Sequence, residues 1–429
     1  MSSPPPAAVP FSELVNEDFI TPGFGPGDRV DPFWSTVWPS SEGGPAISWR
    51  SLHSERAMLN AGNRIASKPG NSRRTRTQDE AIALLNQRRS RLVTLGAINL
   101  WRTVNGQQLV AMTGQPGLNS TRSDETGLLF DAGLIQRGRF HYAGRSLDNS
   151  PEIFRPSPQA DKIDLRHLRY GDWMGTLAGQ SIKGHFYDRH NILATELSLR
   201  AGEICPLRSV LGEAVSTWPQ IFGSALQPNP HRAADALWIR SDGLKIAVEL
   251  TATFTVATAK KIDQLADLLA RDTTKSVVVL FVVAAHPNEG RTSDVTNRLR
   301  QAIKKSSHSS RTRILSEVKT RMVIAKWEDL FPGPGLVTRD FVRLRAQRYD
   351  SVGDEWIDTD LLDPFDVPFD DADSPEVEET STNLNDVLGA PHWMRTGEGA
   401  DFDALLLKMS GFDKVLLARK LATDSGLGT

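Results

Sequence analysis

Residues 231–272 have the sequence HRAADALWIRSDGLKIAVELTATFTVATAKKIDQLADLLARD, and this stretch decides the fold of the chain. Its pattern is typical of a strand that begins after Asp235, a Ser-Asp-Gly hairpin turn, a returning strand that carries Glu249, and a helix. These predicted elements cover residues 236–239, 241–243, 245–251 and 258–270. The stretch therefore predicts two adjacent strands, each with a carboxylate, followed by a helix that opens with lysines.

Segments on both sides of this stretch extend it into an α/β domain. The run SVVVLFVVA at 276–284 is uninterrupted and predicts a strand buried on both faces of a mixed or parallel sheet. A helix that begins at Leu207 and carries Glu213 is expected before the central stretch. A basic helix over 293–306 and a further strand are expected after it. We therefore predict a three-layer α/β domain over 157–332.

Residues 78–156 have the order of elements of an N-terminal winged helix-turn-helix, which combines helices, a turn, a further helix and a two-stranded hairpin. The last helix is expected from Ser120 to Asp131, and in such a domain it enters the major groove. Small polar and arginine side chains suit contacts with phosphates and base edges. The candidate contacts are Asn119, Ser120, Thr121, Arg122, Asp124 and Glu125 on the helix, and Arg137, Arg139 and Arg145 on the hairpin. A winged helix that contacts protein instead of DNA is the alternative.

The net charge of -2 conceals a strong segregation of charge along the 429 residues. Residues 64–91 contain eight basic residues, Arg73, Arg74 and Arg76 among them, and only two acids. Residues 350–379 contain thirteen acids and no lysine or arginine. We expect a disordered, Pro-rich and basic arm over 1–77 that lies along double-stranded DNA. Over 333–429 we expect an acidic linker and a C-terminal amphipathic helix, at 401–421, that packs on the body or binds a protein partner. Solvated surfaces without a partner are the alternative for both charged segments.

Composition excludes several other classes of protein. The single cysteine, Cys205, excludes a disulfide framework and a cysteine-based zinc site, and it fits a reducing compartment. No segment approaches 18 consecutive apolar residues, and the N-terminus lacks the pattern of a secretion signal, so we expect a cytoplasmic protein without a membrane span. The histidines show no HExxH-like spacing, which favours packing or substrate contacts over a metal site.

The acids of the central stretch suit a phosphodiesterase centre. Asp235 and Glu249 on neighbouring strands could hold Mg2+ through their oxygens, with Glu213 as a third ligand. In two-carboxylate nucleases a lysine two residues after the second acid positions water or stabilises developing negative charge. Thr251 occupies that position, on the same strand face as Glu249, and cannot supply a cation. The candidate replacements are Lys245 on the same strand face, and Lys260 and Lys261 on the following helix, where Gln264 is a candidate contact to the DNA backbone.

Residues 206–330 resemble the PD-(D/E)xK nuclease core, whose elements run α-β-β-β-α-β with an acid, an ExK pair and a helix that carries basic or Gln residues. Residues 78–330 together resemble the replication-relaxation family of actinobacterial plasmids and integrated elements, whose members place a winged helix before a nuclease-like domain. The residues that carry this second resemblance are LLFDAGLI at 128–135, His190, HRAADA at 231–236 and AVELT at 247–251. It implies DNA binding in the replication control or mobilisation of a plasmid or mobile element.

Three functions remain open from the sequence. The first is a DNA-binding protein whose nuclease-like domain does not cleave and serves as a structural part or pairs two copies of the chain as a homodimer. The second is a Mg2+-dependent endonuclease that uses Asp235 and Glu249 in replication, mobilisation or defence. The third is a scaffold that joins DNA to a protein partner through the C-terminal helix. Thr251 favours the first, whereas the cost of placing acids on a buried sheet without a cation favours the second.

Overall fold

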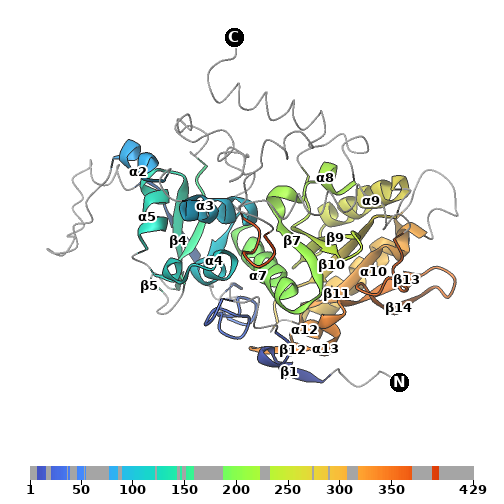
Figure 1. Ribbon diagram of the computed structural model, residues 1–429. Helices are drawn as coiled ribbons and strands as arrows, with labels where there is room; N and C mark the ends of the chain where they lie inside the picture. Colours follow the sequence, from blue (N-terminus) through green and yellow to red (C-terminus); the bar gives the residue numbers. More distant parts are fainter. Residues whose placement is uncertain are drawn as a thin grey trace, which may run out of the picture. The chain divides into compact units, whose positions relative to one another are not determined.

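The chain has a mixed α/β fold that divides into two compact units (Figure 1). Unit 1 comprises Met1–Ser35 and Leu193–Asn385, and unit 2 comprises Thr36–Ile192 and Asp386–Thr429. The computed structural model describes residues 7–15, 21–35, 37–38, 46–52, 54, 77–85, 89–120, 123–142, 145–146, 151–158, 187–222, 232–272, 275–287, 290–306, 317–369 and 389–395. Several predictions fall outside these ranges, namely the contacts of Arg73, Arg74, Arg76, Thr121 and Arg122, the end of the acidic segment, and the helix at 401–421.

Within the described residues, unit 1 contains a seven-stranded sheet in the order β14-β13-β11-β10-β9-β8-β7. The strands β7, β8 and β9 pair antiparallel, β9, β10 and β11 pair parallel, and β13 and β14 add an antiparallel hairpin at the far edge. Their bounds are Leu207–Gly212 (β7), Ala236–Arg240 (β8), Lys245–Thr251 (β9), Val277–Val283 (β10), Met322–Lys326 (β11), Arg345–Asp350 (β13) and Glu355–Asp360 (β14). The predicted hairpin of β8 and β9 and the central strand β10 are therefore present.

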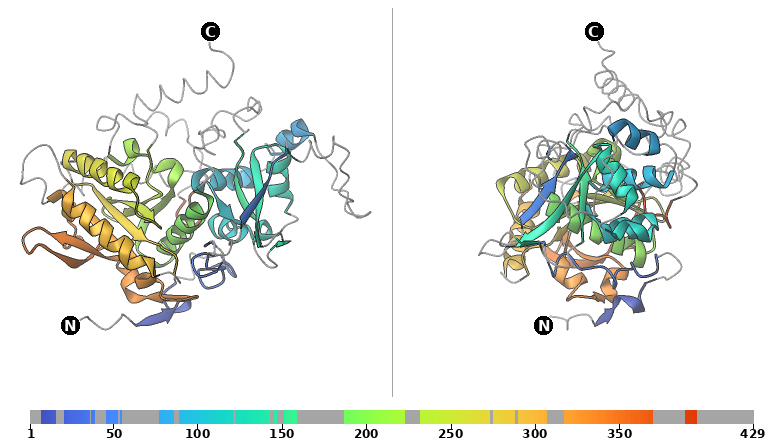
Figure 2. Two further views of the ribbon diagram at one scale, coloured as in Figure 1. Left: turned by 180° about the vertical axis from the view of Figure 1, so that it is seen from behind. Right: turned by 90° about the vertical axis from the view of Figure 1, so that its left-hand side faces the viewer.

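Helices cover both faces of this sheet. The helices α9 (Val256–Arg271) and α10 (Arg291–Lys305) connect consecutive parallel strands, and right-handed crossovers place both on one face, where they lie side by side (Figure 2). The helix α7 (Asp188–Ile204) packs on the other face, where Trp238 Nε1 donates to Ser198 Oγ at 3.0 Å. Every residue of β10 is buried between these layers, which explains its uninterrupted apolar sequence.

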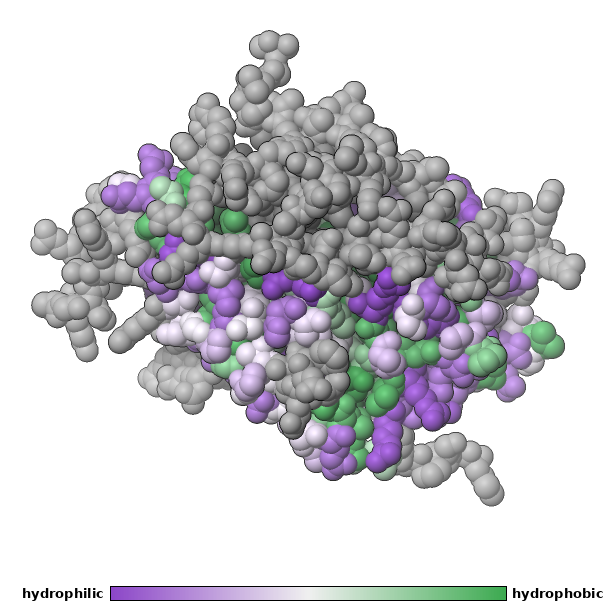
Figure 3. Space-filling view, in the orientation of Figure 1, coloured by the Kyte–Doolittle hydropathy of each residue, from purple (hydrophilic) through white to green (hydrophobic). Residues whose placement is uncertain are grey.

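The outer face of α10 is polar. Val295, Leu299 and Ile303 point into the core at helical spacing, whereas Arg298 and Lys304 are exposed. Hydrophilic residues gather on the same side of the molecule as α10, β13 and β14 in the space-filling view (Figure 3). This exposed surface accounts for the basic composition that the sequence showed over 293–306.

Two predictions about unit 1 were wrong. The segment from Leu207 is strand β7 and not a helix, and Glu213 lies in the short 3₁₀ helix η6 (Glu213–Val215) that follows it. A short apolar run fits either period, and pairing with β8 decides in favour of the strand. The sheet also continues past residue 332, because β13 and β14 form where an acidic linker was expected. The acids of this edge hairpin are exposed or half-buried, so the high charge did not prevent strand formation.

The segment 1–77 was expected to be disordered, but its described residues belong to the folded units, with 7–15 and 21–35 in unit 1 and β2 in unit 2. The strand β1 (Ala8–Pro10) pairs antiparallel with β12 (Leu336–Thr338). Arg29 bridges two acids of α7, with Nη2 at 3.1 Å from Glu196 Oε1 and Nη1 at 2.7 Å from Glu203 Oε1, and all three side chains are buried. Burial alone would lower the pKa of Arg29, but the two carboxylates raise it, so the guanidinium stays charged. A paired network of this kind is how charges become tolerable in a core.

Aromatic rings surround a second arginine of the same network. Arg200 Nη2 lies 2.8 Å from Asp31 Oδ2, and the Arg200 guanidinium stands 4.9 Å from the ring centroid of Phe11 and 4.7 Å from that of Phe331. Phe11 and Phe331 are buried. The isolated aromatics and charges of the N-terminal segment therefore complete the core of unit 1.

Unit 2 combines helices with a five-stranded sheet within the described residues. Its helices are α2 (Gln78–Leu85), α3 (Arg89–Trp101), α4 (Gly106–Thr113) and α5 (Asp124–Asp131), and its strands are β2 (Ala46–Arg50), β3 (Val104–Asn105), β4 (Ile135–Tyr142), β5 (Arg145–Ser146) and β6 (Ile153–Pro156). Asn105 and Gln108 cap α4 reciprocally, and Gly114 ends it in the left-handed conformation. The helix α5 begins at Asp124 and not at Ser120, because Pro116–Asn119 forms a 3₁₀ turn first.

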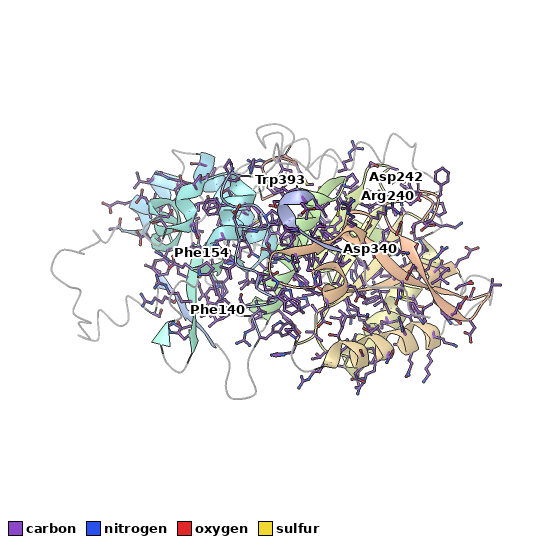
Figure 4. The ribbon with its side chains drawn as sticks, turned by 90° about the horizontal axis from the view of Figure 1, so that it is seen from below. Phe140, Phe154, Arg240, Asp242, Asp340 and Trp393 are labelled. Atoms are coloured by element: carbon purple, nitrogen blue, oxygen red, sulfur yellow. The ribbon has the colours of Figure 1, made fainter. Side chains whose placement is uncertain are left out.

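The sheet of unit 2 pairs β2, β4, β6 and β3 in that order, all antiparallel. Phe140 on β4 and Phe154 on β6 are buried in its core (Figure 4). Residues 389–395 add to this unit, since Trp101 Nε1 donates to the Gly389 carbonyl at 3.0 Å and the His392 N–H donates to the Met112 carbonyl at 2.8 Å. Each unit is thus completed by a segment from one end of the chain.

Candidate functional site

The two predicted acids meet where β8 starts and β9 ends. The backbone N–H of Asp235 donates to the Val248 carbonyl at 2.9 Å, and Asp235 Oδ2 accepts from the backbone N–H of Leu250 at 2.7 Å. These two bonds straddle Glu249, so the Asp235 carboxylate lies against the peptide that follows Glu249. The hairpin of β8 and β9 therefore brings both acids to one edge of the sheet.

Lys261 supplies the cation that the sequence lacks at position 251. Glu249 and Thr251 share the face of β9 that α9 covers, and the Lys261 ammonium forms an ion pair with Glu249 Oε2. The Glu249 side chain is 5% exposed and that of Lys261 is 30% exposed, so the pair is largely buried but reachable from solvent. Thr255 and Thr258 cap α9 reciprocally and fix its start, which places Lys261 over the strand end.

Three carboxylates act on this one ammonium. Burial alone would lower the pKa of Lys261, but Glu249 and Asp235 outweigh it, Glu213 adds to them, and the pKa is raised above its usual value. Glu213 reaches the same edge from η6, because Gly212 at the end of β7 pairs with Ala236 at the start of β8. Glu213 on η6, Asp235 just before β8, Glu249 on β9 and Lys261 on α9 thus form one cluster.

Lys245 is not part of this cluster, which corrects one of the predicted replacements. It opens β9, four residues and about 13 Å of strand from Glu249. Its Nζ donates to the carbonyls of Gln220 at 3.4 Å and Ile221 at 3.1 Å, and burial lowers its pKa. Lys245 therefore caps the end of α8 (Trp218–Phe222), a role that strand alternation alone does not reveal.

The other predicted site residues of unit 1 are Lys260, Thr251 and Gln264, and they differ in burial and in hydrogen bonding. Lys260 is exposed, and Thr251 is buried with its carbonyl accepting from the Ala284 N–H at 3.0 Å. Gln264 lies on α9 one turn beyond Lys261, and its Oε1 accepts a hydrogen bond from Arg232. Arg232 was not among the predicted site residues. Its position three residues before Asp235 was the only sequence signal that could have drawn attention to it.

The carboxylate cluster fits a hard divalent cation in its chemistry. Mg2+ is bound by oxygen ligands, and the carboxylates of Glu249, Asp235 and Glu213 all raise the pKa of the one Lys261 ammonium. Within the ranges that the structure describes, no group of three or more His, Cys, Asp and Glu side chains is already arranged to hold a metal ion. In this arrangement the Lys261 ammonium is the cation that neutralises Glu249.

The candidate nucleic-acid contacts of unit 2 are only partly described. Asn119, Ser120, Asp124 and Arg139 are exposed, whereas Glu125 accepts from Ser90 Oγ at 3.0 Å. Arg137 forms a 2.5 Å ion pair with Glu152 inside the β4–β6 hairpin, which makes it a poorer phosphate contact than predicted. Arg145 lies in β5, with its side chain outside the described atoms.

No family model, curated protein or solved structure matches this chain. A search of the helices in the described ranges finds none that has both the length and the apolar character for a membrane crossing. The chemistry of the site is therefore inferred from the geometry of its own residues.

Proposed function

We propose that the chain binds double-stranded DNA and that unit 1 is a Mg2+-dependent endonuclease. The observation that carries the proposal is the ion pair of Lys261 with Glu249 beside Asp235. With η6 and α8 inserted between β7 and β8, the elements α7, β7, β8, β9, α9 and β10 follow the α-β-β-β-α-β order of the PD-(D/E)xK core, and the acids lie at the start of the second strand and on the third. The lysine of the ExK pair is replaced in space by Lys261, from the helix that follows.

Each residue of the cluster has a role in this proposal. Asp235 and Glu249 would hold the divalent cation through their oxygens, with Glu213, which also acts on Lys261, as the candidate third ligand. Such a cation would supply Lewis-acid stabilisation of the phosphate and activate a water. The carboxylates outweigh the effect of burial on the pKa of Lys261, so its ammonium stays charged at neutral pH, where it would orient that water and balance the negative charge that develops on the phosphoryl oxygens.

Unit 2 supports DNA binding through the order of its elements. The helices α3, α4 and α5 followed by the β4–β6 hairpin have the order of a winged helix, in which α5 would enter the major groove. Exposed Ser120 before α5 and exposed Arg139 on β4 are the described residues best placed for phosphate and base contacts. The resemblance to the replication-relaxation family extends this proposal to replication control or mobilisation of a plasmid or mobile element.

A DNA-binding protein that does not cleave is the second candidate. It is favoured by Thr251 at the usual lysine position and by the absence of a ready-made metal group among the described residues. In that case the Glu249–Lys261 pair is a structural contact. The scaffold hypothesis depends on the helix at 401–421, which lies outside the described residues, and it stays a prediction.

A cleavage assay on duplex DNA with Mg2+ separates the two candidates. We expect wild type to cleave and Asp235→Ala, Glu249→Gln and Lys261→Met each to lose on the order of 100-fold or more in rate. Lys260→Met is the matched control, because it removes an exposed lysine one position away and should cleave like wild type. Absence of Mg2+-dependent cleavage, or equal cleavage by all four variants, would reject the endonuclease and leave the second candidate.

A further inference from the structure

The main chain before Asp235 is fixed beside the acidic cluster. Ala233 bridges Thr217 antiparallel, the Trp218 N–H donates to the Arg232 carbonyl at 2.8 Å, and the Ala234 N–H donates to the Ser216 carbonyl at 2.9 Å. This segment extends beyond the start of β8, at the sheet edge that carries the cluster. Arg232 therefore stands at the rim of the proposed active site.

Two uncharged groups hold the Arg232 side chain. Its Nη1 donates to Gln264 Oε1, and its guanidinium lies 5.3 Å from the ring centroid of Trp218. Gln264 and Lys261 are three residues apart on α9, so they occupy the same helix face. The guanidinium thus lies along the same face of α9 as the Lys261 ammonium, and it is only half buried.

Arg232 differs in this respect from three arginines of unit 1 that are held by acids. Arg29, Arg240 and Arg321 each pair with a carboxylate, whereas no described carboxylate pairs with Arg232. A guanidinium offers five N–H donors in a planar fork that matches phosphate oxygens, and Gln264 engages only one nitrogen. The side chain is therefore oriented, charged and available to an anion.

We infer that Arg232 binds a phosphate of the DNA backbone next to the phosphate that Asp235, Glu249 and Lys261 engage. Gln264 and Trp218 are positioning residues that aim the guanidinium along the strand of DNA. The inference rests on the proposed function for the identity of the polymer, but not on whether the bond is cut. It contrasts with a purely structural role, in which Arg232 only braces α9 against α8.

The test measures DNA affinity of the full chain in EDTA, where no cleavage complicates binding, over a series of salt concentrations. Arg232→Ala should weaken binding by about 10- to 100-fold, the range expected for one charge-assisted hydrogen-bonded contact. The slope of log affinity against log salt should fall by about 0.9, because one phosphate contact is lost. Arg343→Ala is the matched control and should leave the slope unchanged. It removes a 73% exposed arginine just before β13, a strand far from β8 and β9 in the sheet order.

A second variant keeps the side chain in place and blocks its use. Gln264→Glu gives Arg232 a carboxylate partner, so it should preserve the fold and yet weaken DNA binding and lower the salt slope as Arg232→Ala does. A bracing role predicts the opposite, with stability kept or raised and affinity unchanged. Unchanged affinity and slope in Gln264→Glu would overturn the inference, even if Arg232→Ala failed to fold.

The outcomes also separate this inference from the proposed cleavage. A protein that never cuts DNA but shows the loss of slope in both variants would support the Arg232 contact and reject the endonuclease. A protein that cuts DNA while both variants bind with the affinity and salt slope of wild type would reject the Arg232 contact and leave the endonuclease standing.

Discussion

The position of Lys261 depends on the helix that carries it, whereas a lysine at position 251 would depend only on β9. Lys261 reaches Glu249 only because the cap at Thr255 fixes the start of α9 and the helix lies on the Glu249 face of the sheet. The ammonium can therefore be moved by changes in the cap or in helix packing without any change at the strand. Thr251, freed from that role, packs at 7% exposure beside β10.

The raised pKa of Lys261 gives a pH test. A lysine whose pKa is higher in the folded protein adds stability that is complete below its usual value of 10.5 and is lost as pH rises through the folded value. Lys261→Met should lower the free energy of unfolding of unit 1 by about 1–3 kcal/mol from pH 7 to pH 10, and by less above pH 10.5. Denaturant unfolding across this range measures the difference. Lys260→Met should show no such trend, and a Lys261 effect that disappears near neutral pH would contradict the ion pair.

Asp242 gives a test at acid pH. Burial alone would raise the pKa of Asp242, but hydrogen bonds from Arg240 and the backbone N–H of Leu244, together with the charge of Arg240, lower it below its usual 3.8 (Figure 4). A lowered acid pKa adds stability above 3.8 that is lost as pH falls through the folded value. Asp242→Asn should therefore cost about 1–3 kcal/mol at pH 7, and the difference from wild type should shrink below pH 3.8. Unfolding of the exposed-site control Asp263→Asn should match wild type at both pH values.

At the scale of elements, periodic segments were predictable and tertiary placement was not. The alternation of β9 and the apolar run of β10 determine their type because strands in those positions bury one face or both. The strand β7 was mistaken for a helix because its six residues carry no decisive period until β8 pairs with them. In the same way, both acids were predictable from their strands, but the choice of Lys261 over Lys245 depends on which helix covers which face.

The pairing of β2 with β4 depends on Gly138. A Cβ at Gly138 would stand 2.8 Å from Trp49 Cε3, and the Trp49 indole is held by a 3.1 Å hydrogen bond to Asp188 and by Arg155 at 4.0 Å. Gly138→Ala should push β2 away from β4 and destabilise unit 2 by about 1–3 kcal/mol. Thermal unfolding and proteolysis near residues 46–50 would measure this. Gly117→Ala, which has no atom within 4 Å of the new Cβ, should behave like wild type.

At the scale of the whole molecule, the two units are interleaved along the chain. Unit 1 combines Met1–Ser35 with Leu193–Asn385, and unit 2 combines Thr36–Ile192 with Asp386–Thr429. Neither composition nor motif spacing predicted this interleaving. In the sequence, the charged residues of the N-terminal segment look like those of a solvent-exposed segment, and only their partners on α7 show that they are buried. The sequence separation between Arg29 and Glu196 is 167 residues.

The buried charge network can be tested at Arg29. Arg29→Met removes the guanidinium that two buried carboxylates share, and it should destabilise unit 1 by about 3–5 kcal/mol. Arg298→Ala breaks an exposed pair with Asp294 and should cost about 0–1 kcal/mol. Hydrogen exchange at residues 193–204 of α7 reports on unit 1 separately from unit 2. Equal protection of α7 in wild type and Arg29→Met would contradict the network.

Interleaving has a consequence during synthesis. A ribosome adds on the order of 5–20 residues per second, so roughly 8–33 s pass between the appearance of Arg29 and that of Glu196. During that interval the N-terminal segment has no acids to pair with, while residues 36–192 of unit 2 are being synthesised. Arg29 is therefore synthesised well before the acids that it pairs with, and a chaperone or nascent-chain factor that binds it early binds a segment whose partners do not yet exist.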